Sequence, residues 1–129
     1  MGVLIATDVF IEHERGNRSV AETVGDEDWG VSVISVSELL HGVHRAEGAT
    51  RVRRRAWAEH LLAQVEPVPI TMAVARVHAE LWSSLAEAGA VVGQHDLWIG
   101  ATAVAHGLGV VTRNERDFAR MPGLRVLAV

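Results

Sequence analysis

The sequence predicts an α/β fold, a three-layer α/β/α sandwich around a central, mainly parallel sheet. Short apolar runs that read as buried strands, including residues 3–6 and 109–112, alternate along the chain with longer segments of helical periodicity. Parallel sheets are covered by helices on both faces, which produces this alternation. No long linker, internal repeat or low-complexity tract interrupts the 129 residues, so we expect a single domain over residues 1–129.

The first half of the chain is expected to contain two strands and three helices. These are a strand over residues 3–6, a helix from Asp8, a short helix near residues 20–24, a strand over residues 31–34 and a helix from Ser35 to about residue 47. Val36, Leu39 and Val43 recur at helical spacing in the last of these helices, which places them on one inner face.

The second half is expected to continue the alternation. It should contain a helix over residues 50–65, a short strand over 68–70, a helix over 71–88, a helix from His95 or Asp96, a strand over 109–112 and a last strand over 124–127. Thr71 is a favourable N-cap, and Gly107 suits the position just after a helix. Pro69 has no amide proton, which favours a sheet edge for its strand.

Composition excludes several classes of protein. The chain has no cysteine, so disulfides and thiolate metal sites are ruled out, and a reducing cytoplasmic location is expected. The sequence shows neither a signal peptide nor an apolar run of about 18 residues, so no membrane contact is expected. The net charge of −4 argues against coating nucleic acid through bulk charge. Arginines nevertheless cluster near residues 51–55 and 113–120, either as solvated helix faces or as phosphate contacts.

Carboxylate and amide side chains follow the predicted strands or begin the predicted helices. They are Asp8, Glu38, Asp96, Asn114 and Asp117. In open α/β sheets, ligands gather at the carboxyl ends of the strands, so we expect these side chains to cluster there. Each has a simpler explanation when taken alone: Ser35 and Glu38 have the spacing of a capping box, and the others can cap helices.

The joint placement of the acids points to a cation site. Two carboxylates about 4 Å apart repel by roughly 4 kcal/mol at an effective dielectric constant of 20. A fold retains such a cluster when a cation or shared protons offset the repulsion. Hard oxygen donors favour Mg²⁺, with Mn²⁺ as a substitute. A divalent ion held in this way can align a phosphodiester and activate a bound water.

The chain resembles a PIN-domain ribonuclease of the VapC toxin type along nearly its whole length. The matching segments, in order, are residues 3–11 (VLIATDVFI), 35–42 (SVSELLHG), 95–103 (HDLWIGATA) and 111–118 (VTRNERDF). The resemblance implies a three-layer α/β/α domain that cleaves structured RNA, such as tRNA or ribosomal RNA, endonucleolytically with Mg²⁺.

The resemblance also implies roles for individual residues. Glu38 and Asp96 match two metal-site acids of the family, and the fourth acidic position falls on Asn114. Asp117 would supply the missing charge, and Asp8 matches a small polar or acidic position near the metal. The candidate RNA contacts are Arg54, Arg113, Arg116 and Thr112.

Ala6 is the important departure from the family pattern, because it stands at the position of the first metal-site Asp. A methyl group cannot bind a hard cation, so we expect weak Mg²⁺ binding and poor or absent cleavage of RNA. Two explanations are open. An Asp→Ala change engineered to allow expression of a toxic nuclease is favoured, since the rest of the site is intact. A natural inactive binder is the alternative.

The resemblance further implies a homodimer that is neutralised by a small VapB-type antitoxin. An apolar segment of the antitoxin would lie along helical grooves, between the first two helices and the helix over residues 50–65, with a basic residue near the acids. A second hypothesis comes from another class of protein: a non-catalytic PIN-like module that binds RNA or protein. Mg²⁺ affinity before and after restoring Asp at position 6 would separate the two.

Overall fold

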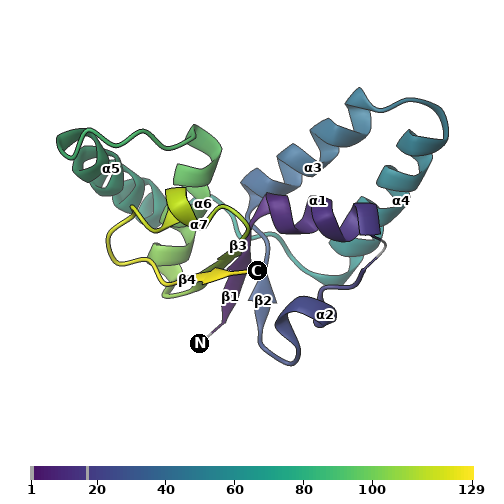
Figure 1. Ribbon diagram of the computed structural model, residues 1–129, viewed down its shortest axis with the longest axis horizontal. Coiled ribbons are helices and arrows are strands. Elements are labelled where there is room, and N and C mark those ends of the chain that lie inside the picture. The colour runs from purple at the N-terminus through teal and green to yellow at the C-terminus, as the bar shows by residue number, and fades with distance from the viewer. Residues whose placement is uncertain (1, 17) are drawn as a thin grey trace.

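A four-stranded parallel sheet forms the centre of the protein. The computed structural model describes residues 2–16 and 18–129. The strands lie in the order β2-β1-β3-β4, and every neighbouring pair is parallel. Their bounds are β1 (Val3–Ile5), β2 (Trp29–Gly30), β3 (Gly109–Thr112) and β4 (Val126–Ala128). Figure 1 shows the strands between two groups of helices.

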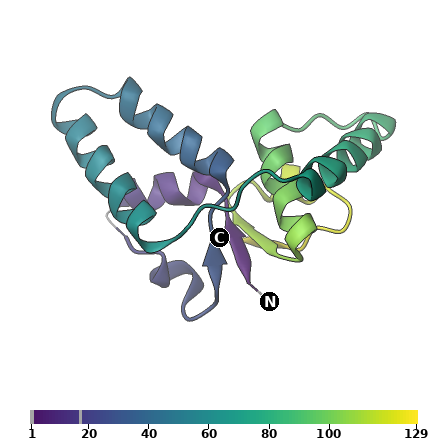
Figure 2. The same ribbon diagram turned by 180° about the vertical axis from the view of Figure 1, so that it is seen from behind.

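Helices cover both faces of the sheet, as Figures 1 and 2 show from opposite sides. One group is α1 (Thr7–Gly16), α2 (Ala21–Val24), α3 (Val33–Arg45) and α4 (Gly48–Gln64). The other group is α5 (Met72–Glu87), α6 (Gln94–His106) and α7 (Glu115–Phe118). The three-layer α/β/α architecture expected from the sequence is therefore confirmed.

Alternation along β1 divides the core into two apolar clusters. Val3 and Ile5 pack in one cluster with Phe10 of α1, whereas Leu4 packs in the other with Leu97 of α6. Successive side chains of a strand point to opposite faces of the sheet, and all three β1 side chains are fully buried. The continuous apolar run at the N-terminus is what a strand covered on both faces requires.

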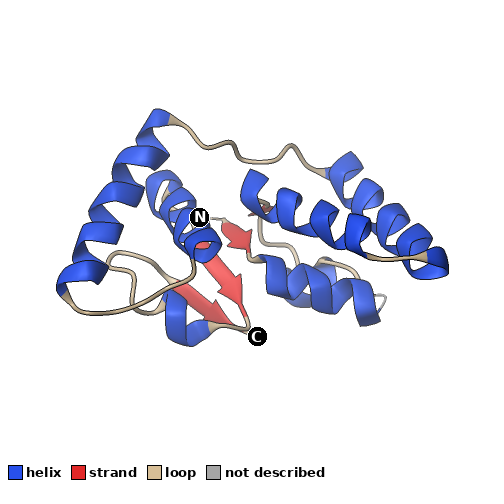
Figure 3. Ribbon diagram, turned by 90° about the horizontal axis from the view of Figure 1, so that it is seen from above, coloured by secondary structure: helices blue, strands red, loops and turns tan. Residues whose placement is uncertain are grey.

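Pairing of β1 with β3 brings two distant segments of the chain together. Ile5 lies opposite Val111, and the Ala6 amide donates to the Val111 carbonyl at 2.9 Å. The residues that follow each strand therefore meet at one edge of the sheet, which Figure 3 shows from above. β2 and β3 lie on opposite sides of β1, so this edge is a topological switch point, where ligands of open α/β sheets bind.

The predicted strand over residues 31–34 and the predicted capping box are wrong. The strand ends at Gly30, and α3 begins at Val33 with Ser32 as its N-cap. The Ser32 hydroxyl accepts a hydrogen bond from the Ile34 amide at 3.0 Å. The apolar run at this point combines a strand end with a helix start, which hydrophobicity alone does not distinguish. As a result, Ser35 lies inside the helix and does not cap it.

Other predicted boundaries shift by smaller amounts. The expected strand over 68–70 reduces to one bridge between Val68 and Ser32, next to the prolines that limit pairing. Thr71 does cap α5, with its hydroxyl 3.3 Å from the Val74 amide. Gly107 ends α6 in the left-handed conformation, with φ +67°.

No helix between residues 2–16 or 18–129 combines the length and the apolar character that a bilayer crossing demands.

Two helical glycines should respond in opposite ways to alanine. A Cβ at Gly42 of α3 would meet no atom within 4 Å, so Gly42→Ala should stabilise the protein by about 0.5–1 kcal/mol through the higher helix propensity of alanine. A Cβ at Gly100 of α6 would collide with the buried Met121 side chain, so Gly100→Ala should cost about 1 kcal/mol or more. Urea unfolding measures both changes, and equal signs would contradict the packing described here.

Candidate active site

Glu38 is held at the sheet edge by groups from both helical layers. It extends from the second turn of α3, and its Oε1 accepts a hydrogen bond from the Thr7 hydroxyl at 2.7 Å. The same hydroxyl lies 2.8 Å from the buried Ser35 hydroxyl. On the other side, Glu38 Oε2 lies 3.3 Å from His95 Nδ1 at the start of α6. The carboxylate therefore has a defined position between α1 and α6.

Asn114 joins two further carboxylates. Its Nδ2 donates to Asp96 Oδ2 at 3.2 Å and to Asp117 Oδ2 at 3.1 Å. Asn114 occupies the residue before α7 but makes no capping hydrogen bond with its side chain. One amide group thus holds an acid from α6 beside an acid from α7.

Asp8 connects the start of α1 to the end of β3. Its Oδ2 accepts from the Arg113 amide at 3.0 Å and from the Thr112 hydroxyl at 3.2 Å. The Thr112 hydroxyl in turn accepts a hydrogen bond from the backbone amide of Asn114 at 2.8 Å. These contacts join Asp8 to Asp96 and Asp117 through Thr112 and Asn114, and Glu38 lies near enough for its charge to raise the pKa of Asp96.

Ala6 lies between the end of β1 and the start of α1. It is 1% exposed and belongs to the apolar cluster that contains Leu4 and Leu97. Its side chain contributes no donor or acceptor to the edge.

The donor chemistry fits a hard divalent cation, but the arrangement is incomplete. The nearby groups are carboxylate and amide oxygens, which Mg²⁺ prefers. Across residues 2–16 and 18–129, however, no three His, Cys, Asp or Glu side chains form a group that could hold a metal ion.

Electrostatics at the edge act most strongly on Asp96. Burial raises the pKa of its carboxyl above the ordinary value, and the hydrogen bond from Asn114 partly opposes this effect. The negative charges of Glu38, Asp8 and Asp117 raise the pKa further. Three carboxylates thus lie close enough to Asp96 to disfavour its ionised form, which is the situation that a bound cation would relieve.

The predicted RNA-contacting residues differ in their surroundings. Arg113 is exposed and pairs with Glu12 at 2.7 Å. Arg116 is exposed at the surface of α7. Arg54 instead donates to the Gly42 carbonyl at 3.2 Å, and Thr112 is fully buried. The first two arginines present charge to solvent, whereas Thr112 acts on its neighbours inside the protein.

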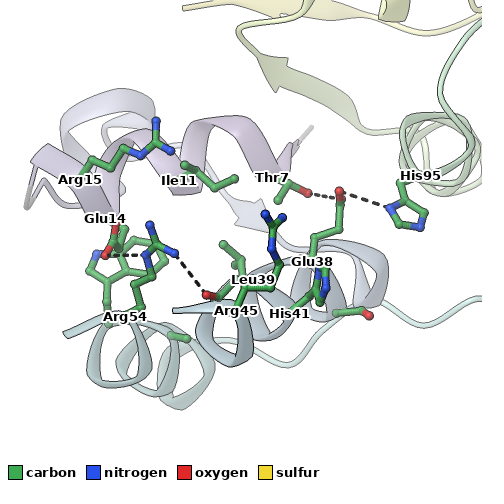
Figure 4. A pocket seen from close by; sticks show the side chains of 14 residues that line it. Thr7, Ile11, Glu14, Arg15, Glu38, Leu39, His41, Arg45, Arg54 and His95 are labelled. Atoms are coloured by element: carbon green, nitrogen blue, oxygen red, sulfur yellow. Dashed lines mark hydrogen bonds and ion pairs between the residues drawn. The ribbon is translucent and has the colours of Figure 1, made fainter. Parts of the chain in front are cut away.

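A pocket adjoins the acidic edge between α1, α3 and α4 (Figure 4). Glu38, Thr7 and His95 line it, and so do Arg15 and Arg45, which the sequence analysis did not single out. The spacing of these two arginines along their helices could have identified them as residues near the site. Arg45 follows Glu38 by seven residues on α3, and Arg15 follows Thr7 by eight on α1, so each arginine shares a helix face with a residue of the edge.

Comparisons with known proteins agree with the fold. The family model "PIN domain" matches residues 3–124. Ribonuclease VapC4 of Mycobacterium tuberculosis is 38% identical over 126 residues, which cover 98% of this chain and 95% of that protein. The tRNA(fMet)-specific endonuclease VapC of Salmonella typhimurium is 31% identical over 96 residues, covering 74% of this chain and 71% of that one.

A solved structure extends the agreement to three dimensions. VapBC-5 from Mycobacterium tuberculosis, a member of the VapBC family of toxin-antitoxin systems, matches with a TM-score of 0.80 at 32% identity, covering 99% of this chain and 97% of the other. The architecture is therefore that of a PIN domain. Within that class, the chain belongs to the VapC family of ribonuclease toxins of toxin-antitoxin systems.

Neutralising Asp96 should stabilise the metal-free protein in a pH-dependent way. Because the pKa of Asp96 is raised in the folded state, stability falls as pH rises from the ordinary pKa through the raised one. Asp96→Asn should therefore raise the thermal unfolding midpoint at pH 7 in EDTA. The gain should vanish below about pH 3.9, where the wild-type carboxyl is neutral in both states. Circular dichroism from pH 3 to 8 measures it, with exposed Asp26→Asn as control, and a pH-independent gain would contradict the prediction.

Removing the Thr7 hydroxyl should weaken the fold as well as the site. Thr7→Val conserves shape but leaves Glu38 and the buried Ser35 without this partner. We expect a loss of about 1–2 kcal/mol, since hydrogen bonds to charged groups contribute more than neutral ones and this carboxylate is partly exposed. Urea unfolding measures the loss, with exposed Ser83→Ala as control. Equal effects of the two variants would show that the hydroxyl is not an anchor.

Proposed function

We propose that the protein is a metal-dependent endoribonuclease that hydrolyses a phosphodiester bond in structured RNA, such as tRNA or ribosomal RNA. The observation that carries the proposal is the meeting of Glu38, Asp96, Asp117 and Asp8 at one edge of a parallel sheet. The similarity to a tRNA(fMet)-specific endonuclease supports a structured RNA as the substrate class.

Each residue of the edge has a proposed role. Glu38 and Asp96 would hold Mg²⁺ or Mn²⁺, and Asp8 and Asp117 would complete the shell directly or through water. When bound, the ion would polarise the phosphodiester and lower the pKa of an attacking water. Asn114 would keep Asp96 and Asp117 in place through its amide. Arg113 and Arg116 would bind phosphates beside the scissile bond.

Ala6 would reduce the activity of this chain. The first metal ligand of the proposed site is missing, and Asp8 is already occupied by two donors from the end of β3. Weak Mg²⁺ binding and slow cleavage would follow. An Asp→Ala change that disarms a toxic nuclease accounts for one altered position in a connected network, and a natural variant with low activity is the other origin.

A non-catalytic PIN-like module that binds RNA or protein is the second candidate function. Two observations favour it: the methyl group at position 6, and the lack of any metal-holding group of three side chains within the part of the chain that the structure describes. Such a module would keep the fold and the arginines without hydrolysing the bound partner.

The partners proposed for the chain are a VapB-type antitoxin and a second copy of itself. The antitoxin is supported by the similarity to VapBC-5, a member of the VapBC family of toxin-antitoxin systems. Its apolar segment would lie in the groove between α1, α3 and α4, with a basic residue near Glu38. The homodimer is proposed from the resemblance to the family.

Restoring a carboxylate at position 6 tests the proposed function. Ala6→Asp should raise Mg²⁺ affinity at least about ten-fold, since even the loss of an outer-shell partner costs 10–100-fold. It should also produce or accelerate Mg²⁺-dependent cleavage of total bacterial RNA. Isothermal titration calorimetry and sequencing of the RNA ends measure the two effects.

Ala6→Asn is the matched control, because it adds a side chain of the same size without charge. If Ala6→Asp binds Mg²⁺ no better than Ala6→Asn and cleaves no RNA, the nuclease proposal fails. The binding-module alternative would then be preferred.

A further inference from the structure

The pocket beside the acidic edge has a definite size and position. It encloses about 400 Å³ between α1, α3 and α4, within the range of pockets that take small organic groups. Thr7, Glu38 and His95 lie at the end that meets the candidate active site, as Figure 4 shows. Any group in this pocket would therefore lie next to Glu38, one of the acids that we propose to act on a phosphodiester.

The charges that line the pocket leave two cations without partners. Buried Glu14 is neutralised by Arg53 at 3.2 Å and Arg54 at 3.8 Å. By contrast, the side chains of Arg15 and Arg45 make no hydrogen bond or ion pair with any residue that the structure describes. Figure 4 shows Arg45 extending from α3 toward α1. Two unpaired guanidinium groups favour an anionic ligand, and phosphate matches their geometry.

The floor of the pocket is apolar. Ile11, Leu39, Trp57 and Ala58 line it. Trp57 is fixed by an edge-to-face contact with buried Phe10, at a ring separation of 6.1 Å. An apolar surface with one ordered aromatic ring suits an unpaired base, because bases stack on aromatic and apolar side chains.

We propose that this pocket receives an unpaired nucleotide adjacent to the cleaved phosphodiester of the RNA. The base lies on the apolar floor by Trp57, and the neighbouring backbone phosphates contact Arg45 and Arg15. The inference rests on the proposed function, since it assigns a subsite of the same RNA. A protein segment bound in this pocket would then exclude the RNA nucleotide, because both would occupy the same space.

Charge removal tests the phosphate contacts without requiring catalysis. The full chain is titrated into fluorescein-labelled total bacterial tRNA in EDTA, and anisotropy is followed at several salt concentrations. Arg15→Ala and Arg45→Ala should each weaken binding several-fold. Each should also reduce the magnitude of the negative slope of log K against log salt by about 0.7–0.9, the value for one lost phosphate contact. Exposed Arg76→Ala on α5, in the opposite layer, is the matched control and should leave the slope unchanged.

Filling the pocket tests the nucleotide without changing any charge. A Cβ at Gly42 would point into open space, so Gly42→Phe should occupy the pocket. Binding of tRNA should weaken about ten-fold, the loss of roughly one stacked base. Ala79→Phe places the same ring on the exposed surface of α5 and should have no effect. Thermal unfolding of each variant confirms that it is folded, and the arginine variants keep the test valid if Gly42→Phe does not fold.

The outcomes separate this inference from the proposed function. Unchanged tRNA binding by Arg15→Ala, Arg45→Ala and Gly42→Phe would overturn the pocket assignment, even if Ala6→Asp cleaves RNA. If Gly42→Phe weakens only the binding of a VapB-type antitoxin, the pocket is a peptide site and the inference is wrong. If the parent chain binds no tRNA in EDTA, the pocket assignment fails, whereas the nuclease proposal is decided by the Mg²⁺ binding and RNA cleavage of Ala6→Asp.

Discussion

The parallel pairing of β1 with β3 is the constraint on which the candidate site depends. It aligns the ends of two strands that are more than a hundred residues apart, with the Ala6 amide bonded to the Val111 carbonyl. The Asp8 carboxylate can then accept hydrogen bonds from the Thr112 hydroxyl and the Arg113 backbone amide. The Thr112 hydroxyl can accept one from the Asn114 backbone amide. A slip of one residue in this register would turn the buried side chains of β1 to the wrong faces and separate these partners.

Neutral donors allow the acids to remain together in the absence of a cation. Hydroxyl groups and one amide each touch a carboxylate, so repulsion among the acids is spread over several hydrogen bonds. The compensation is incomplete at Asp96, where burial and neighbouring charge raise the pKa of the carboxyl. The fold therefore carries a local electrostatic cost at the same place where it could bind a metal ion.

Much of the architecture could be predicted from apolar periodicity, because β1 and β3 are continuous buried runs and α5 has both an inner stripe and a capping threonine. The error at residues 31–34 arose where a strand of two residues leads almost directly into α3. Glu38 was located correctly, but its partner is Thr7, 31 residues away, and local spacing suggested Ser35. The pocket was not predicted, because Arg15 and Arg45 join the site only through the packing of α1 against α3.

The two apolar clusters support different halves of the acidic edge. Glu38 extends from α3, whose inner residues pack in the cluster that contains Phe10. Asp96 and Asp117 extend from α6 and α7, whose Leu97 and Phe118 belong to the other cluster. Loosening either cluster displaces one half of the edge relative to the other. In a genetic selection for cells that survive expression of an active form, escape mutations would therefore map to interior positions of both layers. Sequencing the surviving clones would therefore identify core residues of both clusters as well as the acidic residues.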